Sequence, residues 1–234
     1  MDDARAVIYQ VKQIFHSTLP IAILHCDELD SSIDQRFADF SDVRVVNICN
    51  GKGLFGMNHE DTKRRLRSWF CKTAALILSP FNETIVSDLD VVWFKQPDKL
   101  FDSPAFRRTG TIFFRDRLTF NRKRQSVNDK IFQDVIEEYI QQQSSLSGIS
   151  VNITAKLGAL KLRDDGGVSF FWRNVVDREE PTLDNFQDSS VLVVDRSRHP
   201  LLLEVLSRIL PSFNLGYGDK EIYWISAIIS GKRA

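Results

Sequence analysis

The chain has 234 residues, 43% of them hydrophobic, and its 31 basic and 31 acidic side chains give a formal net charge of zero. This length can bury a substantial core, whereas the balanced charge excludes an electrostatic basis for binding nucleic acid or an anionic membrane. No apolar run approaches the roughly 20 residues of a membrane span, and the acidic start Met1-Asp2-Asp3 is unlike a signal peptide.

Helical and extended patterns alternate along the chain. Apolar periodicity and end signals predict helices over 4–15, 33–37, 61–78, 129–143, 199–210 and 217–229, with a helical turn at 97–101. Short apolar runs predict strands over 20–25, 43–48, 84–90, 110–114 and 191–195. This order predicts an α/β fold with a Rossmann-like, mostly parallel sheet flanked by helices. We expect a single domain over 1–234 with a mobile insertion at 141–150.

Two helices carry apolar stripes at helical spacing. In the first, the stripe comprises Val7, Val11, Ile14 and Phe15. In the longest, Asp61 is the expected N-cap, and the stripe comprises Leu66, Phe70, Ala74 and Leu78. We expect each stripe to form one side of its helix.

The three cysteines, Cys26, Cys49 and Cys71, show no C-x-x-C spacing that would indicate a metal site. Their number is odd, and each lies beside apolar residues. The sequence therefore predicts buried free thiols.

The strand over 84–90 ends in two carboxylates, Asp88 and Asp90, that are separated by Leu89. Alternate side chains of an extended strand share a face, so both carboxylates are expected on one side with Leu89 packed behind them. Two hard oxygen ligands at the carboxyl end of a buried strand suit Mg²⁺ or Mn²⁺. A pair of solvated aspartates in a turn is the alternative, and the spacing alone does not decide.

The surroundings of this pair resemble the Golgi-type α-mannosyltransferases of fungi and oomycetes. The similar segments are Trp69–Ala74, Ser79–Thr84, Asp88–Asp90, Pro97–Phe101, Gly110–Asp116, Gln187–Asp195 with Arg198-His199, and Tyr217–Trp224. They cover about 19–224. The resemblance implies a GT-A glycosyltransferase fold, a Mn²⁺ or Mg²⁺ ion and a nucleotide-sugar donor, with GDP-mannose expected and a UDP-hexose as the alternative. It also implies a glycan or glycoprotein acceptor, retention of anomeric configuration and the Golgi lumen, although the sequence alone also fits a cytoplasmic protein.

Matching positions carry the family's expected roles. The resemblance implies metal ligation by Asp88 and Asp90, and catalytic roles for Asp188 and Asp219. The implied donor-binding residues are Lys72, Asp88, Gln187, Ser189 and Lys220. Without the resemblance, the alternative for Lys72 is an ordinary exposed helix lysine, and the alternative for Asp219 is a helix N-cap. We expect His199, which precedes a proline, to serve packing.

Three departures from the family pattern stand out. Asp188 and Ser190 replace its Glu and Gly, the chain opens on the helix that follows the family's first strand, and it ends soon after Trp224. The first strand and a C-terminal segment are therefore expected to be missing, together with a later metal-binding histidine. These departures motivate one alternative, a non-catalytic binding module of GT-A type.

A phosphatase of the haloacid-dehalogenase type is the other alternative. Asp88-Leu89-Asp90-Val91-Val92 matches its D-x-D-x-V opening, in which the first aspartate is the nucleophile. However, 87 residues precede the motif here, and Asp164-Asp165 lacks the apolar strand that should lead into a second acidic pair.

Overall fold

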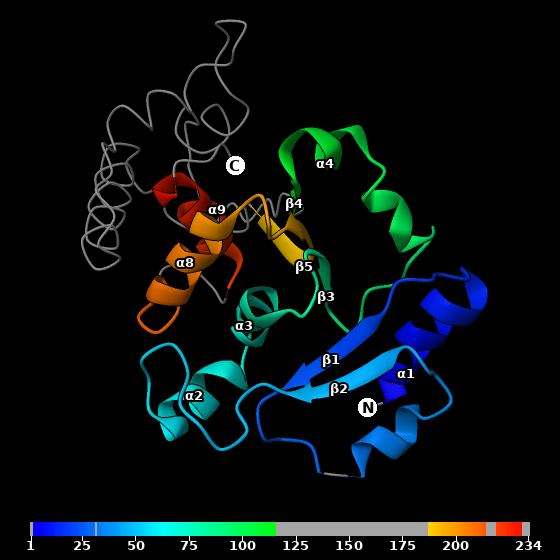
Figure 1. Cartoon of the computed structure of the whole chain (residues 1–234), viewed down its shortest axis with the longest axis horizontal. Helices are drawn as coiled ribbons and strands as arrows, with labels where there is room; N and C mark the ends of the chain where they lie inside the picture. The colour runs from blue at the N-terminus through cyan, green and yellow to red at the C-terminus, as the bar shows by residue number, and fades with distance from the viewer. Residues whose placement is uncertain (1, 31, 116–186, 214–218, 231–234) are drawn as a thin grey trace, which may run out of the picture. The chain divides into compact units, whose positions relative to one another are not determined.

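The computed structural model describes residues 2–30, 32–115, 187–213 and 219–230 (Figure 1). It divides into two compact units, one of residues 1–114 with 189–203 and one of residues 115–188 with 204–234. The helix predicted over 129–143 and the insertion at 141–150 lie outside the described residues, and the single-domain organisation stays a prediction. Within the described ranges, none of the helices has the length and apolar character needed to cross a membrane.

The described strands form two sheets. In the first, β1 (Ile21–His25) pairs in parallel with β2 (Val43–Asn47), and His25 lies opposite Asn47. The second has the order β3-β5-β4 and comprises β3 (Glu83–Ser87), β5 (Gln187–Asp195) and β4 (Thr111–Arg115). β3 and β5 run antiparallel. The predicted α/β class is confirmed, and the described strands combine parallel with antiparallel pairing.

Helix α1 (Asp2–Tyr9) continues as a π-helical turn, η1 (Gln10–Ile14). Ala4 and Ile8 are buried with the 3-10 helix η2 (Ile33–Phe37) against apolar residues of β1 and β2. The predicted stripe is wrong at its end, because Ile14 is 58% exposed. The Phe15 N–H donates to the Gln10 carbonyl oxygen at 3.0 Å, and this i+5 bond shifts the helical register after Tyr9.

The long helix predicted over 61–78 is two helices, α2 (His59–Leu66) and α3 (Cys71–Leu78). Asn58 rather than Asp61 caps the first, since its side chain accepts the Asp61 N–H at 2.9 Å. Helix α2 ends before Arg67, whose guanidinium donates to the Cys26 and Asp27 carbonyl oxygens at 2.9 and 2.6 Å. These tertiary bonds outweigh the continuous helical pattern.

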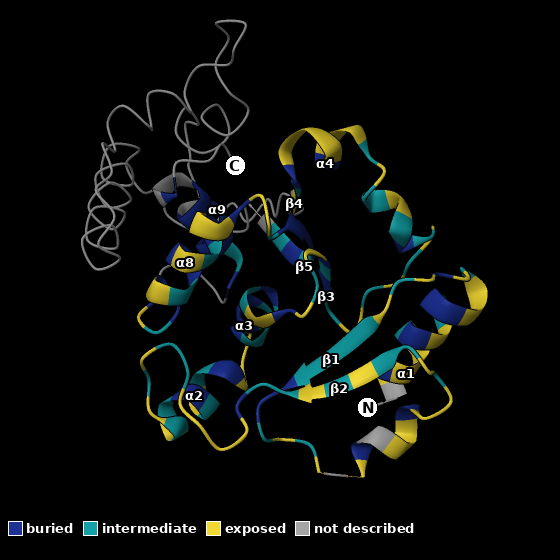
Figure 2. Ribbon diagram, viewed as in Figure 1, coloured by how far each residue is buried: buried dark blue, intermediate teal, exposed yellow. Residues whose placement is uncertain are grey.

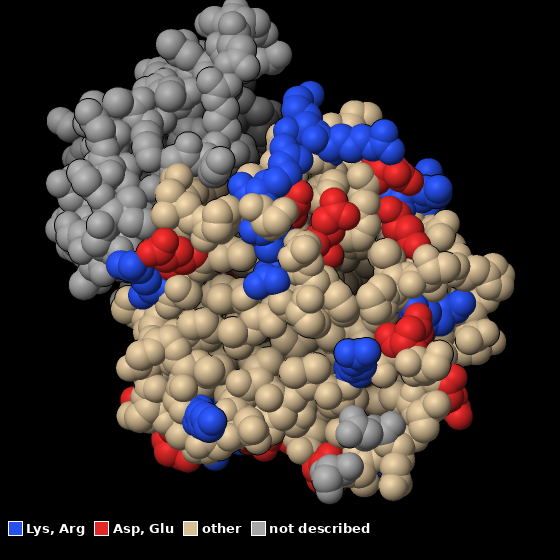
Figure 3. Space-filling view, in the orientation of Figure 1, with Lys and Arg blue, Asp and Glu red and all other residues tan. Residues whose placement is uncertain are grey.

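The remaining helices are η3 (Pro97–Leu100), α4 (Pro104–Thr109), α8 (Pro200–Ile209) and α9 (Lys220–Ile229). They confirm the predicted turn at 97–101 and the two C-terminal helices. Figure 2 shows buried residues along both α8 and α9. These buried residues include Leu202, Leu206, Ile209, Ile222 and Tyr223. On the face shown in Figure 3, basic and acidic side chains lie intermixed, as the balanced composition leads one to expect.

Candidate functional site

The turn that carries the two aspartates begins where β3 ends, at Ser87. The chain turns at Leu89 and Asp90, and the Val91 N–H lies 3.4 Å from the Asp88 carbonyl oxygen that it donates to. The strand predicted to run through Asp90 is therefore wrong in its last residues. Leu89 is 52% exposed instead of packing behind the carboxylates, because it occupies a turn rather than a strand.

Lys72, in the first turn of α3, holds the Asp88 side chain. Its Nζ lies 3.1 Å from Asp88 Oδ2, and it donates to Ser189 Oγ at 2.9 Å and to the Ser189 carbonyl oxygen at 3.2 Å. The Asp88 N–H donates to the carbonyl oxygen of Ser190 at 2.8 Å. We call Lys72, Asp88 and Ser189 the Lys72 cluster. It unites three predicted donor-binding residues from α3, the turn after β3 and strand β5.

The Lys72 cluster is partly shielded from water. The side chains of Lys72 and Asp88 are 16% and 33% exposed, and Ser189 is buried. In such surroundings an ion pair is screened less than at an open surface. The cluster therefore presents a fixed positive group beside a carboxylate, an arrangement that suits a ligand carrying both phosphate and hydroxyl groups.

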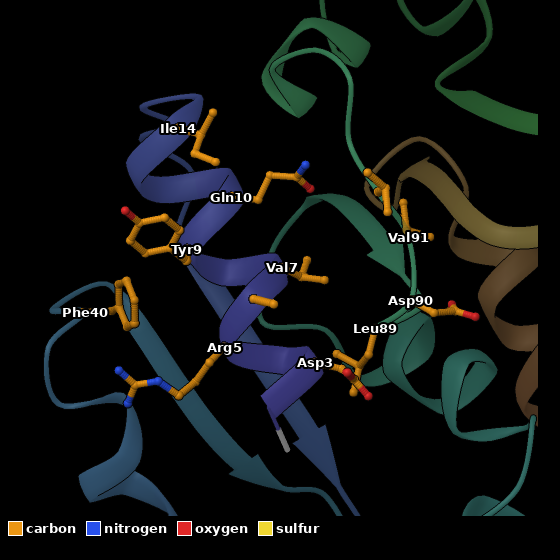
Figure 4. Close-up of a pocket in the computed structure, with 12 residues that line it drawn as sticks. Asp3, Arg5, Val7, Tyr9, Gln10, Ile14, Phe40, Leu89, Asp90 and Val91 are labelled. Carbon is orange, nitrogen blue, oxygen red and sulfur yellow. The ribbon is translucent and has the colours of Figure 1, made fainter.

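Asp90 lies two residues further along and is exposed. It lines a hollow of about 600 Å³ together with residues of α1 and η1, and Figure 4 shows its carboxylate pointing away from α1. The segment after the turn is fastened to η1 by Gln10, whose side chain donates to the Trp93 carbonyl oxygen and accepts the Trp93 N–H, both at 2.9 Å. This two-point contact fixes the path of the chain leaving Asp90.

A second polar cluster, missed from the sequence, lies at the carboxyl ends of β1 and β2. Asp27 accepts hydrogen bonds from Asn47 Nδ2 at 2.6 Å and from the Gly51 N–H at 3.3 Å, and its Oδ2 lies 2.7 Å from His59 Nε2. Position along the chain could have indicated this cluster, because Asp27 and Asn47 lie at the ends of two predicted strands. In parallel sheets, ligand-binding polar groups lie at the carboxyl ends of the strands.

The contacts of Asp27 predict an acid sensitivity. The hydrogen bonds from His59 and Asn47 lower the pKa of Asp27 to about 2, below the unfolded value of about 3.9. A lowered folded-state pKa contributes stability that is complete above the unfolded value and is lost as the pH falls through the folded one. We expect the free energy of unfolding to fall between about pH 4 and pH 2, and Asp27→Asn to flatten this fall. Urea unfolding at stepped pH measures both, with the exposed Asp39→Asn as the matched control; equal profiles in the two variants would contradict the assignment.

Cys26 and Cys49 form a disulfide, with their Cα atoms 4.9 Å apart. The prediction of three free thiols is therefore wrong for this pair, and Cys71 alone is free. The parallel register explains the pairing, since His25 lies opposite Asn47 and the cysteines follow just beyond. Among the described residues, Cys26, Asp27 and Cys49 bring three potential ligand atoms within 4.8 Å of one another. The disulfide uses both sulfurs, so this group is not a metal site.

The other predicted site residues belong to the second unit. Gln187 and Asp188 open β5 and belong to the second unit, as do Asp219 and Lys220 at the start of α9. Asp219 is 2% exposed and accepts the Tyr223 hydroxyl at 2.9 Å. The Tyr223 hydroxyl gives this buried carboxylate a hydrogen-bond donor, while the catalytic roles of Asp188 and Asp219 stay predictions.

His199 is buried and its Nε2 lies 2.7 Å from the Thr109 carbonyl oxygen. Gly110 follows α4 with φ of 73°, and a Cβ there would lie 2.9 Å from His199 Nε2. The ring therefore packs against the end of α4, in agreement with the packing role expected for it.

Comparison with known proteins identifies the family of this chain. Residues 4–233 match the family described as "Mannosyltransferase putative". The chain belongs to this mannosyltransferase family. In Saccharomyces cerevisiae, the probable alpha-1,3-mannosyltransferase MNT4 is 25% identical over 96% of this chain, and the alpha-1,3-mannosyltransferase MNT3 is 29% identical over 69%. The chain spans 38% of the length of the first relative and 25% of the second. Family membership favours glycosyl transfer over the phosphatase alternative.

Proposed function

We propose that this chain carries the donor site of a metal-dependent mannosyltransferase that transfers mannose from GDP-mannose to a glycan hydroxyl with retention of configuration. The observation that carries the proposal is the Lys72 cluster, in which the 3.1 Å ion pair between Lys72 and Asp88 stands two residues before Asp90. The names of the relatives support an α-1,3 linkage in the product.

The residues of the turn fit a hard divalent cation. Asp88 and Asp90 both offer carboxylate oxygens, the ligands that Mn²⁺ and Mg²⁺ prefer, and solvent reaches both side chains. When bound, such a cation supplies positive charge that makes a diphosphate a better leaving group. Asp88 and Asp90 are the residues that would hold it.

The chain's own groups supply the remaining chemistry. The Lys72 ammonium donates to Asp88 and Ser189, so its positive charge is fixed in place before the donor arrives and can attract the donor phosphates. As the family resemblance implies, we assign Asp188 to the hydroxyls or the reacting carbon of the donor sugar. Retention requires no general base opposite the leaving group, which agrees with the packing role of His199.

A thermal-shift panel tests donor and metal together. We expect GDP-mannose with Mn²⁺, at about 100 times its Kd, to raise the Tm by about 5–10 °C. GDP-mannose with EDTA, UDP-galactose with Mn²⁺, and Mn²⁺ alone serve as matched controls. A larger rise in Tm with UDP-galactose than with GDP-mannose would identify galactose, rather than mannose, as the donor sugar.

Binding does not distinguish an enzyme from a binding module, so transfer is measured on the same samples. With an α-mannobiose acceptor, mass spectrometry should detect a product heavier by one hexose, together with free GDP. Donor binding without hydrolysis or transfer would favour the binding module of GT-A type. Phosphate release from simple phosphate esters, without any sugar donor, would favour the phosphatase.

A further inference from the structure

The chain passes from α3 into β3 through a short connection, 79–82 (Figure 1). Asn82-Glu83-Thr84, at the end of this connection, has the form N-x-S/T of an acceptor sequence for N-linked glycosylation, and its middle residue is not the excluded proline. A match over three residues arises easily by chance. The surroundings of Asn82 therefore decide whether this side chain can carry a glycan.

Arg196 holds the main chain of this connection. Its guanidinium donates to the carbonyl oxygens of Ile77, Ser79 and Phe81 at 2.8, 2.6 and 2.9 Å. Its main-chain N–H donates to the carbonyl oxygen of Asn82 at 2.8 Å. All of these residues lie in the first unit. The path of the connection is therefore fixed by bonds that do not involve the side-chain amide of Asn82.

The two residues that define the acceptor sequence have opposite surroundings. Asn82 is exposed, and among the described residues its side-chain amide forms no hydrogen bond. Thr84 is only 4% exposed, and its Oγ1 donates to the Phe81 carbonyl oxygen at 3.0 Å and lies 2.9 Å from Ser79 Oγ. A glycan on Asn82 would extend into water and would displace no core side chain.

The order of the chain leaves the acceptor sequence open during synthesis, although Thr84 is buried in the folded protein. Thr84 pairs with Val194 of β5, and Arg196, which holds the connection, lies 117 residues after Ser79. At about 5–20 residues per second, synthesis of this stretch takes on the order of 10 s. During that time the partners that bury Thr84 do not yet exist, so both the amide and the hydroxyl are accessible.

The disulfide between Cys26 and Cys49 is independent evidence on the compartment. Disulfides form and persist in oxidising compartments, which include the lumen of the endoplasmic reticulum. The N-x-S/T acceptor is used in secreted proteins. The bridge and the exposed asparagine, which lie in different parts of the first unit, therefore fit the same environment.

We propose that Asn82 is a site of N-linked glycosylation, with an oligosaccharide supplied by a lipid-linked diphosphate donor. In the transfer, a bond forms between Asn82 Nδ2 and the anomeric carbon of the first sugar. The bond from that carbon to the diphosphate oxygen breaks, the lipid diphosphate leaves with the electron pair, and the amide nitrogen loses one proton. Asn82 and Asp88 flank β3 (Glu83–Ser87), roughly 20 Å apart at the rise of an extended strand. The glycan is therefore attached at the end of β3 away from the Lys72 cluster.

The test directs the full chain into the endoplasmic reticulum of cultured cells with a cleavable signal peptide. The chain carries Asn152→Gln, because Asn152-Ile153-Thr154 is a second acceptor sequence. Peptide:N-glycosidase removes N-linked glycans and leaves aspartate at the attachment point, which mass spectrometry of the peptides locates. We expect this protein to lose the mass of one glycan, with aspartate found at position 82.

Three variants in the same background separate the acceptor sequence from the fold. Asn82→Gln and Thr84→Val should abolish the loss of mass, whereas Thr84→Ser, which keeps the hydroxyl of the acceptor sequence, should preserve it. Glycan attachment precedes folding, so it is measured in protein retained in the cells as well as in secreted protein, and a variant that fails to fold still gives a result.

Two results would overturn the proposal: an unmodified Asn82 in the chain that keeps its acceptor sequence, or a glycan of equal mass in the Asn82→Gln protein. Neither readout depends on transferase activity, so failure here leaves the proposed function unaffected.

Discussion

Replacing Asp90 by asparagine is expected to lower the kcat/KM of Mn²⁺-dependent mannosyl transfer at least about 100-fold, or about 2.7 kcal/mol of transition-state stabilisation. The amide has nearly the shape of the carboxylate but lacks its negative charge, so it binds a hard cation weakly. Asp90 is exposed in a turn, and an exposed substitution of this kind usually changes stability by less than about 0.5 kcal/mol. The loss should therefore appear in activity and not in the Tm.

The comparison with Asp88→Asn sharpens this prediction. Asp88 pairs with Lys72 at 3.1 Å, and the pair is only partly exposed. Removing one member of such a pair leaves a poorly compensated charge, so Asp88→Asn should lower both the Tm and the activity. Asp102→Asn, at an exposed aspartate that pairs with Arg107, is the control that should preserve both.

Initial rates measured across a Mn²⁺ titration check the assignment of Asp90. We expect the asparagine variant to need a higher Mn²⁺ concentration and to stay below the wild-type maximum. A variant with wild-type rates at every Mn²⁺ concentration would remove Asp90 from the metal site and leave Lys72 as the main phosphate-binding group.

Local patterns were sufficient to predict most elements of the fold. The strands around Ile23, Val45 and Val193 are short apolar runs bounded by turn residues, and their type is set mainly by local sequence. The grouping of Lys72 with Asp88 was expected only from the resemblance to a family, since without it Lys72 is an ordinary exposed helix lysine. The resemblance to a family added the expectation for Ser189.

Tertiary contacts decided the features that the sequence did not predict. A continuous stripe runs through Leu66 and Phe70, yet Arg67 breaks the helix by bonding to carbonyl groups more than 30 residues away. The turn at Leu89 comes directly after the Asp88 N–H, which donates to the Ser190 carbonyl oxygen of β5. The cysteine pairing depends on the register of β1 against β2. No local window contains this information.

Loss of the Cys26–Cys49 bridge is expected to lower the free energy of unfolding by about 3 kcal/mol, as estimated from the entropy of a loop closed over a separation of 23 residues. For a chain of this size the corresponding fall in Tm is about 6–12 °C. The bridge joins the ends of β1 and β2 directly beside Asp27. Its removal should therefore also loosen the cluster that Asn47 and His59 form with that carboxylate.

Thermal unfolding of the oxidised chain, the reduced chain and Cys26→Ala/Cys49→Ala measures this contribution. Cys71→Ala is the matched control, because Cys71 is the free cysteine, and burial raises the pKa of its thiol to about 11, which disfavours the reactive thiolate. Reduction should lower the Tm of the wild type and of the Cys71 variant equally, and should leave the double variant unchanged. Equal Tm values before and after reduction would show that the bridge adds no stability.

Formation of the Cys26–Cys49 disulfide depends on the redox conditions in which the protein is made. Disulfides persist in oxidising compartments and are rare in the reducing cytosol. We expect the protein secreted from cells to resist thiol alkylation at Cys26 and Cys49 until it is reduced. The protein made in a reducing cytosol should be alkylated at both cysteines without prior reduction. Because the unbridged chain is less stable, the cytosolic protein should also unfold at the lower temperature of the double variant, and oxidation in vitro should restore the difference.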